Sequence, residues 1–373
     1  MGYLCPVMVK EVKSKKIEHL FKTPIIQQTA YWSKVKSHFG MQSIAFDFFV
    51  YKDDEVILRD LVVFIKNVDK DYSVAYVPYG PETEPIKEEQ GALLEALSEQ
   101  LKEYLPQGCI MIRYDLVWES IWADDPDYKT DQGIWLGPPS RGAQEIRFNY
   151  STISGNFRKS PTNILPSNTV LVNIDSQEAE ILGRMKPKTR YNIALSARKG
   201  VNVRVAGLES MSVWYNLYKE TAIRNNFYLH SEDYFKVALT EKAGDSLSPA
   251  DVSLLIAEYE SIPLAAMFLV VTGNRATYLY GASSSLHRHL MAPYSIQWRA
   301  MTLAKEKGCI QYDMFGVSPG NDTTHPMYGL YRFKSGFGGS LYHAMGCWDY
   351  PLDHKIYPLY IASEIKNQSY HLT

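Results

Sequence analysis

The chain has 373 residues, of which 46% are apolar and 21% are charged, and its formal net charge at pH 7 is −2. This balance excludes a disordered chain, and the near-neutral charge excludes a globally basic, nucleic-acid-coating surface. The most apolar run, residues 265–271, is too short to cross a bilayer, and no apolar stretch follows the N-terminal lysines, so we expect a cytoplasmic protein. The length of the chain predicts two domains.

The first half of the chain predicts a helix, an antiparallel hairpin, a third strand, a second helix and a further strand. Apolar and aromatic residues recur at helical spacing up to Gly40, and two runs rich in Val, Ile and Phe then flank four charged residues. The predicted elements are a helix at 25–39, strands at 43–51, 56–66 and 72–78, a helix at 86–104 and a strand at 109–115.

Much of this order recurs in the second half of the chain. The last strand of each series begins with the same Gly-Cys-Ile tripeptide, at residues 108–110 and 308–310. The second series comprises a hairpin at 252–260 and 264–272, a strand at 276–282, a helix at 293–306 and the strand that begins at 308. The repetition indicates a structural duplication, so we predict an α/β (α+β) fold with two mixed sheets flanked by helices.

The segment of residues 118–166 is rich in Asp, Gly, Pro and Ser, which is typical of a long irregular connection between domains. We therefore place the first domain at residues 1–166 and the second at residues 167–346. We expect the C-terminal tail, residues 347–373, to contain a short helix and to pack back on the first domain.

Seven separated stretches carry further information. They are WSKVK at 32–36, YGPETE at 79–84, KPKTRYNIALSARKGV at 186–201, TAIRNNFYLHSEDYF at 221–235, YGASSSLHRHLMAPYSIQW at 280–298, YDMFGV at 312–317 and YRFKSGFG at 331–338. In this order and spacing, which extend over most of the chain from residue 32 to residue 338, they resemble the FemABX family of peptidyltransferases.

The resemblance implies two domains similar to the GNAT acetyltransferase fold, here without the long helical arm of some relatives. It also implies an aminoacyl-tRNA donor and an acceptor that is either lipid II or the soluble UDP-MurNAc-pentapeptide. The product would be the interpeptide bridge of peptidoglycan. The family uses no metal and no coenzyme A, so we expect no cofactor beyond the tRNA co-substrate, and a peripheral contact with the inner face of the membrane is compatible with the lipid-linked acceptor.

Aminoacyl transfer places negative charge on an ester carbonyl oxygen, and a positioned cation stabilises that charge. Lys334 lies between Phe333, whose ring would border the substrate, and three glycines at 336, 338 and 339, which permit close approach of backbone or substrate. The resemblance assigns Lys334 to the oxyanion. Without that resemblance, a lone lysine is most often an ordinary surface charge.

The attacking amine must lose a proton, yet no histidine and carboxylate pair stands out in the sequence. Asp115, at the end of a predicted strand, matches a family carboxylate that has been considered as the general base. The alternatives are a structural aspartate that binds backbone amides and proton transfer by the substrates themselves.

The resemblance assigns the phosphates of the acceptor to Lys36 and to a second position, which is arginine in the family and His230 here. Arg224, six residues upstream, is the candidate to replace the missing guanidinium, although it could equally be a solvated helix residue. Tyr234 and Tyr294 match tyrosines near the acceptor, and core packing is the alternative role for each.

Residues 181–204 carry basic side chains and no acidic residue, with Tyr191 among them. The basic residues are Arg184, Lys186, Lys188, Arg190, Arg198, Lys199 and Arg204. Charge of one sign next to an aromatic ring suits a phosphate backbone, so this segment predicts a tRNA-binding surface. The alternative is a solvated helix face.

Three other functions remain open at the level of sequence. A coenzyme A dependent N-acyltransferase would share the fold, but its pyrophosphate loop is matched only partly, at residues 204–209, where Glu209 breaks the pattern. A noncatalytic cell-wall scaffold would not need Lys334 and its surroundings. A tRNA-dependent transferase could also use a protein N-terminus or a lipid head group as acceptor.

Overall fold

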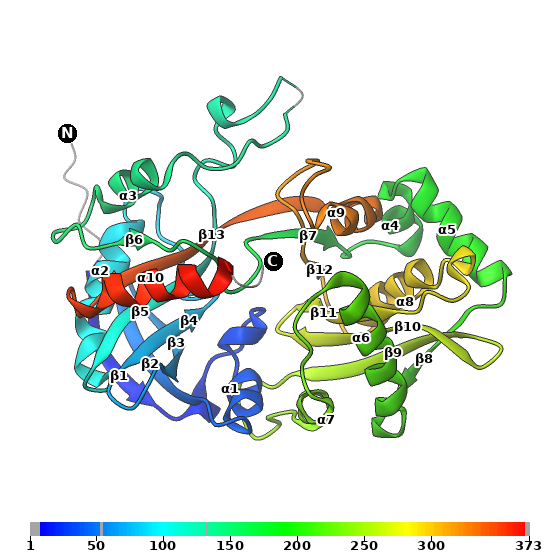
Figure 1. Ribbon diagram of the computed structural model, residues 1–373, viewed down its shortest axis with the longest axis horizontal. Helices are drawn as coiled ribbons and strands as arrows, with labels where there is room; N and C mark the ends of the chain where they lie inside the picture. The colour runs from blue at the N-terminus through cyan, green and yellow to red at the C-terminus, as the bar shows by residue number, and fades with distance from the viewer. Residues whose placement is uncertain (1–7, 53–54, 132, 370–373) are drawn as a thin grey trace. The chain divides into compact units, whose positions relative to one another are not determined.

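The computed structural model describes residues 8–52, 55–131 and 133–369. The chain forms two compact units (Figure 1). The first unit comprises Met1–Phe21, Lys36–Ser167 and His343–Thr373, and the second comprises Lys22–Val35 and Asn168–Tyr342. Within the described residues, no helix has the length and apolar character needed to cross a membrane.

The first unit is built on a mixed sheet with the strand order β1-β2-β3-β4-β5-β13, and the short strand β6 pairs with β13. Among the strand pairs of this sheet that the structure describes, only β4–β5 is parallel. The strands are β1 (Met8–Lys15), β2 (Gln42–Lys52), β3 (Glu55–Asn67), β4 (Ser73–Pro78), β5 (Cys109–Glu119), β6 (Arg158–Lys159) and β13 (Ser340–Pro351).

Helix α2 (Gln90–Leu101) provides the crossover that the parallel β4–β5 pair requires, and a 3-10 turn, Lys102–Tyr104, continues it. Its leucines at 93, 94, 97 and 101 are buried in the core of the first unit, as their helical spacing predicts. The predicted hairpin at 43–51 and 56–66 is confirmed, with β2 and β3 paired along their length.

Two regions differ from the prediction. Residues 118–166 contain helix α3 (Arg141–Asn149) and strand β6, and Ser140 caps α3 by accepting a hydrogen bond from the amide of Ala143. The predicted helix at 25–39 is a 3-10 turn (Ile26–Gln28) followed by α1 (Ala30–Ser37). Thr29 separates them because its backbone is extended and its hydroxyl accepts from the amide of Trp32.

The C-terminal segment packs within the first unit. Strand β13 pairs with β5, and helix α10 (Ile356–Ser369) follows. The guanidinium of Arg113 on β5 is buried and binds Asp349 of β13 at 2.6 Å and Glu364 of α10 at 2.7 Å. These charge-assisted bonds tie the tail to the sheet.

The second unit has its own mixed sheet, ordered β7-β12-β11-β10-β9-β8, in which only β11 and β12 are parallel. Its strands are β7 (Asn168–Asn173), β8 (Asn202–Ala206), β9 (Asp251–Tyr259), β10 (Ile262–Thr272), β11 (Arg275–Ser283) and β12 (Gln311–Gly316). Its helices from residue 168 onward are α4 (Glu178–Arg184), α5 (Pro187–Arg198), α6 (Met211–Asn225), α7 (Glu232–Thr240), α8 (Ala292–Glu306) and α9 (Tyr328–Lys334).

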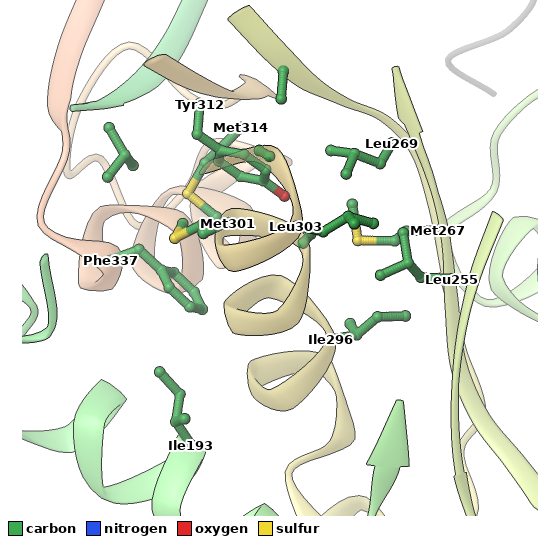
Figure 2. Close-up of a cluster of buried hydrophobic side chains, with 14 of the residues drawn as sticks. Ile193, Leu255, Met267, Leu269, Ile296, Met301, Leu303, Tyr312, Met314 and Phe337 are labelled. Carbon is green, nitrogen blue, oxygen red and sulfur yellow. The ribbon is translucent and has the colours of Figure 1, made fainter. Parts of the chain in front are cut away.

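Helix α8 runs through the core of the second unit. Leu255, Met267 and Leu269 of the sheet lie on one side of it, and Ile193 of α5 and Phe337 lie on the other (Figure 2). Such two-sided contact buries α8 between the sheet and α5, and it fixes the elements that carry the site described below.

The predicted duplication is present in the strand order. The series β2-β3-β4-α2-β5 and β9-β10-β11-α8-β12 each consist of a hairpin, a third strand, a crossover helix and a parallel strand. Gly108 and Gly308, which precede the last strand of each series, have φ angles of +82° and +81°. The two copies therefore share a left-handed turn that glycine adopts without strain. The predicted class, mixed sheets flanked by helices, is confirmed.

Residues 22–35 belong to the second unit, whereas the prediction assigned all of 1–166 to the first domain. The physical reason is a set of hydrogen bonds to later segments. The amide of Ala30 donates to Ser248 Oγ at 2.9 Å, and the hydroxyl of Tyr31 donates to the carbonyl of Ala238 at 2.8 Å. The remaining divisions between the units lie at Ser167–Asn168 and Tyr342–His343, whereas the prediction placed them after residues 166 and 346.

Candidate active site

Lys334 is the last residue of α9 and is only 5% exposed. Its Nζ donates to the carbonyl oxygens of Phe315 at 3.1 Å and Gly316 at 2.9 Å, and it lies 5.2 Å from the ring centroid of Tyr278. Burial lowers the pKa of Lys334 to about 7, although the nearby carboxylate of Asp313 opposes that shift. Lys334 is therefore a buried donor that titrates close to neutral pH.

Three glycines after Lys334 allow the chain to pass closely against neighbouring backbone. A Cβ at Gly336 would lie 2.3 Å from Thr189 Oγ1, and one at Gly339 would lie 2.6 Å from the carbonyl oxygen of Leu171. Gly338 has a φ of +79°, and a Cβ there would lie 2.7 Å from the backbone of Arg184. These glycines fix the turn that follows Lys334 against α4, α5 and β7.

An aromatic cluster lies beside this turn. The Tyr294 ring of α8 is 5.0 Å from the Phe333 ring of α9, edge to face, and 5.9 Å from the Phe337 ring, stacked. Tyr294 and Phe333 are half-buried, whereas Phe337 is fully buried. Two of the predicted substrate-binding residues thus lie together next to Lys334 and keep part of their surface exposed.

His230 and Tyr234 form part of a second aromatic group in the same unit. The His230 imidazole stacks on the Tyr234 ring, with 4.5 Å between centroids. The Tyr234 hydroxyl shares a 2.8 Å hydrogen bond with that of Tyr280, and burial raises the pKa of Tyr234 to about 12. His230 is half-buried while Tyr234 is 5% exposed, so His230 has the larger surface available to a ligand.

Arg224, the predicted substitute for the missing family arginine, already binds neighbouring groups of the chain. Its guanidinium donates to the carbonyl of Ser283 at 2.9 Å, to Ser283 Oγ at 3.0 Å and to Ser285 Oγ at 3.3 Å. It also lies 3.7 Å from Glu220 of the same helix. This geometry favours a role in holding the segment after β11 against α6.

Lys36 and Asp115 lie among residues of the first unit. Lys36 is half-buried in α1, and burial lowers its pKa to about 8. Asp115 has no exposed surface, and its Oδ2 accepts hydrogen bonds from the amide of Leu165 at 2.8 Å and the hydroxyl of Tyr76 at 3.1 Å. Burial raises the pKa of Asp115.

Of the seven basic residues in the predicted tRNA-binding segment, six are exposed and lie in or beside α4 and α5, whereas Arg204 lies on β8 and pairs with Glu258 at 3.3 Å. Lys186 links them to the lysine site, since its amide donates to the carbonyl of Gly336 at 2.9 Å and its Nζ donates to Ser335 Oγ at 3.3 Å. On the outer face of α5, Lys188, Tyr191 and Arg198 follow helical spacing, and Tyr191 is 57% exposed. We call the exposed side chains of Arg184, Lys186, Lys188, Arg190, Arg198 and Lys199 the basic surface.

Several residues that complete these groups were not singled out from the sequence. Asp313, Phe315 and Tyr278 surround the Lys334 ammonium, and Tyr280 joins the His230 group. Phe315 contributes its backbone carbonyl, and its φ angle is +58°. A bulky residue rarely adopts a positive φ, so the sequence does not predict this conformation. Within the described residues, no group of three or more His, Cys, Asp or Glu side chains is arranged to hold a metal ion.

The chain is similar to known proteins along most of its length. The model of the FemAB family matches residues 21–247 and 250–364. The lipid II:glycine glycyltransferase of Staphylococcus saprophyticus is 23% identical over 390 residues and covers 89% of each chain. The protein of the same name from Staphylococcus epidermidis is 24% identical over 292 residues, covering 63% of this chain and 69% of its own length. The crystal structure of FemX superposes with a TM-score of 0.71 at 20% identity, covering 94% of this chain and all of FemX, which shows a common fold.

Proposed function

The chain belongs to the FemAB family, and from this premise we propose that it is a transferase that builds the peptide bridge of peptidoglycan. It would join an amino acid from aminoacyl-tRNA to the stem peptide of a cell-wall precursor in the cytoplasm. The names of its relatives, lipid II:glycine glycyltransferases, support this reaction class and favour glycine and lipid II. The single observation that carries the proposal is the buried Lys334 next to the basic surface.

Lys334 would stabilise the oxyanion of the transferred aminoacyl ester. Its ammonium is held by two backbone carbonyls, so a third partner can be bound without first fixing a flexible side chain. The low-polarity surroundings that lower its pKa to about 7 also strengthen its attraction to a developing negative charge. Tyr294 and Phe333 would border the reacting groups and limit the access of water.

The reaction balances without a cofactor. The acceptor amine attacks the ester carbonyl, the new carbon–nitrogen bond forms, and the bond to the ribose oxygen of the tRNA breaks. The proton lost by the amine passes to that ribose oxygen. Asp115, the predicted general base, has no exposed surface and holds the Leu165 amide, so we propose that the substrates carry this proton and that Asp115 orders the backbone.

The basic surface would bind the phosphates of the tRNA. Its exposed charges have one sign, and Tyr191 offers a ring on which a base can stack. Since Lys186 bonds to the turn after Lys334, tRNA bound there would hold its aminoacyl end in the same unit as the proposed oxyanion donor.

In the second unit, the phosphates of the acceptor would be bound by His230, whose imidazole can donate to phosphate oxygens. Lys36 of the first unit stays a separate predicted phosphate contact. Tyr234 is buried and hydrogen-bonded to Tyr280, so its part is to position His230, on which it stacks. Both lipid II and UDP-MurNAc-pentapeptide carry the required diphosphate.

A coenzyme A dependent acyltransferase is the second candidate, and the geometry of residues 204–209 disfavours it. The backbone amide of Gly207, at the place where a pyrophosphate would be held, donates to Glu209 Oε1 at 2.9 Å. This amide is therefore already bonded to a carboxylate of the protein, and the negative charge of that carboxylate would repel a bound pyrophosphate.

The deciding experiment offers the purified protein a mixed pool of radiolabelled aminoacyl-tRNA together with lipid II or UDP-MurNAc-pentapeptide. We expect labelling of one acceptor that is abolished by ribonuclease and strongly reduced in Lys334→Met. Labelling from acetyl coenzyme A in place of charged tRNA would refute the proposal.

A further inference from the structure

An exposed group of large apolar side chains lies in the second unit, where two segments meet. The segments are residues 223–229, at the end of α6, and residues 285–289, after β11. Single exposed apolar side chains are normal on protein surfaces, but a group is not. The exposed fractions are 84% for Ile223, 41% for Phe227, 79% for Tyr228, 38% for Leu229 and 60% for Leu286. We call the two segments the α6–β11 surface.

Hydrogen bonds hold the two segments side by side. The guanidinium of Arg224 reaches across to the carbonyl of Ser283 at 2.9 Å and to Ser285 Oγ at 3.3 Å. In return, the amide of Ser285 donates to Glu220 Oε1 at 2.6 Å. The apolar side chains of both segments are thus presented together by an ordered framework and not by independent loops.

The two segments themselves carry no acidic residue, and the acidic residues that follow on α7, Glu232 and Asp233, are paired with Lys236. Arg288 is exposed between His287 and His289. Glu220, the nearest acidic side chain along α6, is engaged by Ser285 and Arg224. Exposed apolar side chains next to the exposed cation Arg288 match the interface of an anionic bilayer, which offers acyl chains below a layer of negative head groups.

We propose that the α6–β11 surface docks the protein on an anionic phospholipid membrane. The inference rests on the proposed function, because a lipid-linked acceptor presents its diphosphate at that membrane surface. His230 directly follows the first segment, and its ring meets that of Tyr228 at 5.3 Å. Docking would therefore bring the proposed phosphate contact to the depth of the lipid head groups and favour the lipid-linked acceptor over the soluble one.

The test measures co-sedimentation of the full chain with phosphatidylcholine vesicles that contain or lack phosphatidylglycerol. The paired variant Ile223→Ser with Leu286→Ser should lower the partition coefficient on anionic vesicles about tenfold. The matched control is Ile146→Ser with Leu359→Ser, whose side chains are 77% and 67% exposed on α3 and α10 of the first unit. It should stay within about twofold of the wild type. Arg288→Ala should lower the partition coefficient on anionic vesicles about fivefold at low salt and by a smaller factor at high salt.

The proposal is overturned if the wild type ignores anionic vesicles, or if the control pair loses as much binding as the α6–β11 pair. A parallel transfer assay separates this from the proposed function. The α6–β11 pair should retain transfer to soluble UDP-MurNAc-pentapeptide while losing transfer to lipid II in vesicles. Vesicle binding without transfer to any acceptor would refute the proposed function and leave the docking surface standing.

Discussion

Each unit contains a buried lysine with similar immediate partners, but the surroundings of the two lysines differ. Lys159 of β6 donates to the carbonyls of Met345 and Cys347 at 3.0 and 2.9 Å and lies 5.4 Å from the Trp348 ring. Lys334 likewise donates to two carbonyls and lies over the ring of Tyr278. Burial lowers the pKa of both, to about 8 for Lys159 and about 7 for Lys334.

The difference lies in what adjoins each ammonium. Lys159 sits on a strand paired with β13, and Asp115 and Asp349 both act to raise its pKa. Lys334 ends a helix, has Asp313 as its acidic neighbour, and leads into a glycine turn next to the basic surface. The same donor chemistry links β6 to β13 in the first unit, whereas in the second unit we propose that it serves a substrate. Burial alone does not identify a catalytic lysine.

The largest expected effect comes from exchanging each lysine for methionine. Lys334→Met should lower the rate of aminoacyl transfer about 10²–10³-fold, because the oxyanion loses its donor. Lys159→Met should keep the rate per folded molecule within about threefold and lower the melting temperature. Single-turnover transfer and thermal unfolding followed by circular dichroism measure the two effects.

If both variants lost transfer equally, the contrast between the two lysines would be wrong. Lys334→Arg serves as the control for charge, since it keeps a cation but not the compact ammonium. It should recover only part of the transfer rate.

Reversing charge on the basic surface should weaken the tRNA interaction. Lys188→Glu with Arg198→Glu should raise the Michaelis constant for aminoacyl-tRNA about thirtyfold at low salt, with kcat nearly unchanged, because phosphate contacts contribute to binding. Lys16→Glu with Lys70→Glu makes the same change in net charge on exposed residues of the first unit. An equal effect of both pairs would point to net charge and remove the basic surface as a specific site.

The pH dependence of stability can separate the two lysines. Lys334 has a pKa of about 7 in the folded protein against an ordinary value of 10.5, so above pH 7 the unfolded chain holds a proton that the native state has released. The free energy of unfolding should therefore increase as the pH rises above about 7, and Lys334 contributes at most about 1.4 kcal/mol per pH unit to this increase. Lys159, with a pKa of about 8, should add its rise only above pH 8.

Urea unfolding between pH 7 and 8 tests this order. Lys334→Met should flatten the rise in that interval, whereas Lys159→Met should flatten it mainly above pH 8. A wild-type stability that does not increase between pH 7 and 8 would contradict the low pKa of Lys334.

The smallest expected effect is that of Asp115→Asn. The amide keeps the shape of the side chain but is a weaker acceptor for Leu165 and Tyr76, so the free energy of unfolding should fall by about 1 kcal/mol. Transfer per folded molecule should change less than twofold. A loss of transfer above tenfold with unchanged stability would instead make Asp115 the general base.

The sequence predicted the elements whose local pattern agrees with the fold. The β2–β3 hairpin follows from β-branched runs around a charged turn, and α2 follows from its leucine spacing. Helix α3 was not predicted because the segment around it is rich in Asp, Gly, Pro and Ser, which indicated an irregular connection. The break at Thr29 depends on a hydroxyl that can serve either a helix interior or a cap.

The candidate site was predicted unevenly for a similar reason. The resemblance singled out Lys334, Phe333 and Tyr294, which the structure brings together. It could not show that the Lys334 ammonium is held by backbone carbonyls, because these have no residue identity. Arg224 has a suitable charge for a phosphate, but its bonds to Ser283 and Ser285 become visible only once β11 is placed next to α6.

The paired left-handed glycines also bear on how the two copies tolerate mutation. A Cβ at Gly108 would lie 2.1 Å from the carbonyl oxygen of Asp71, whereas Gly308 has no atom within 4 Å of the same point. In a saturation library selected for folded protein, we expect glycine alone at position 108. At position 308 we also expect residues such as asparagine, which can adopt a left-handed backbone conformation. The duplicated gene segment would thus carry one turn held fixed by selection and another that is free to drift.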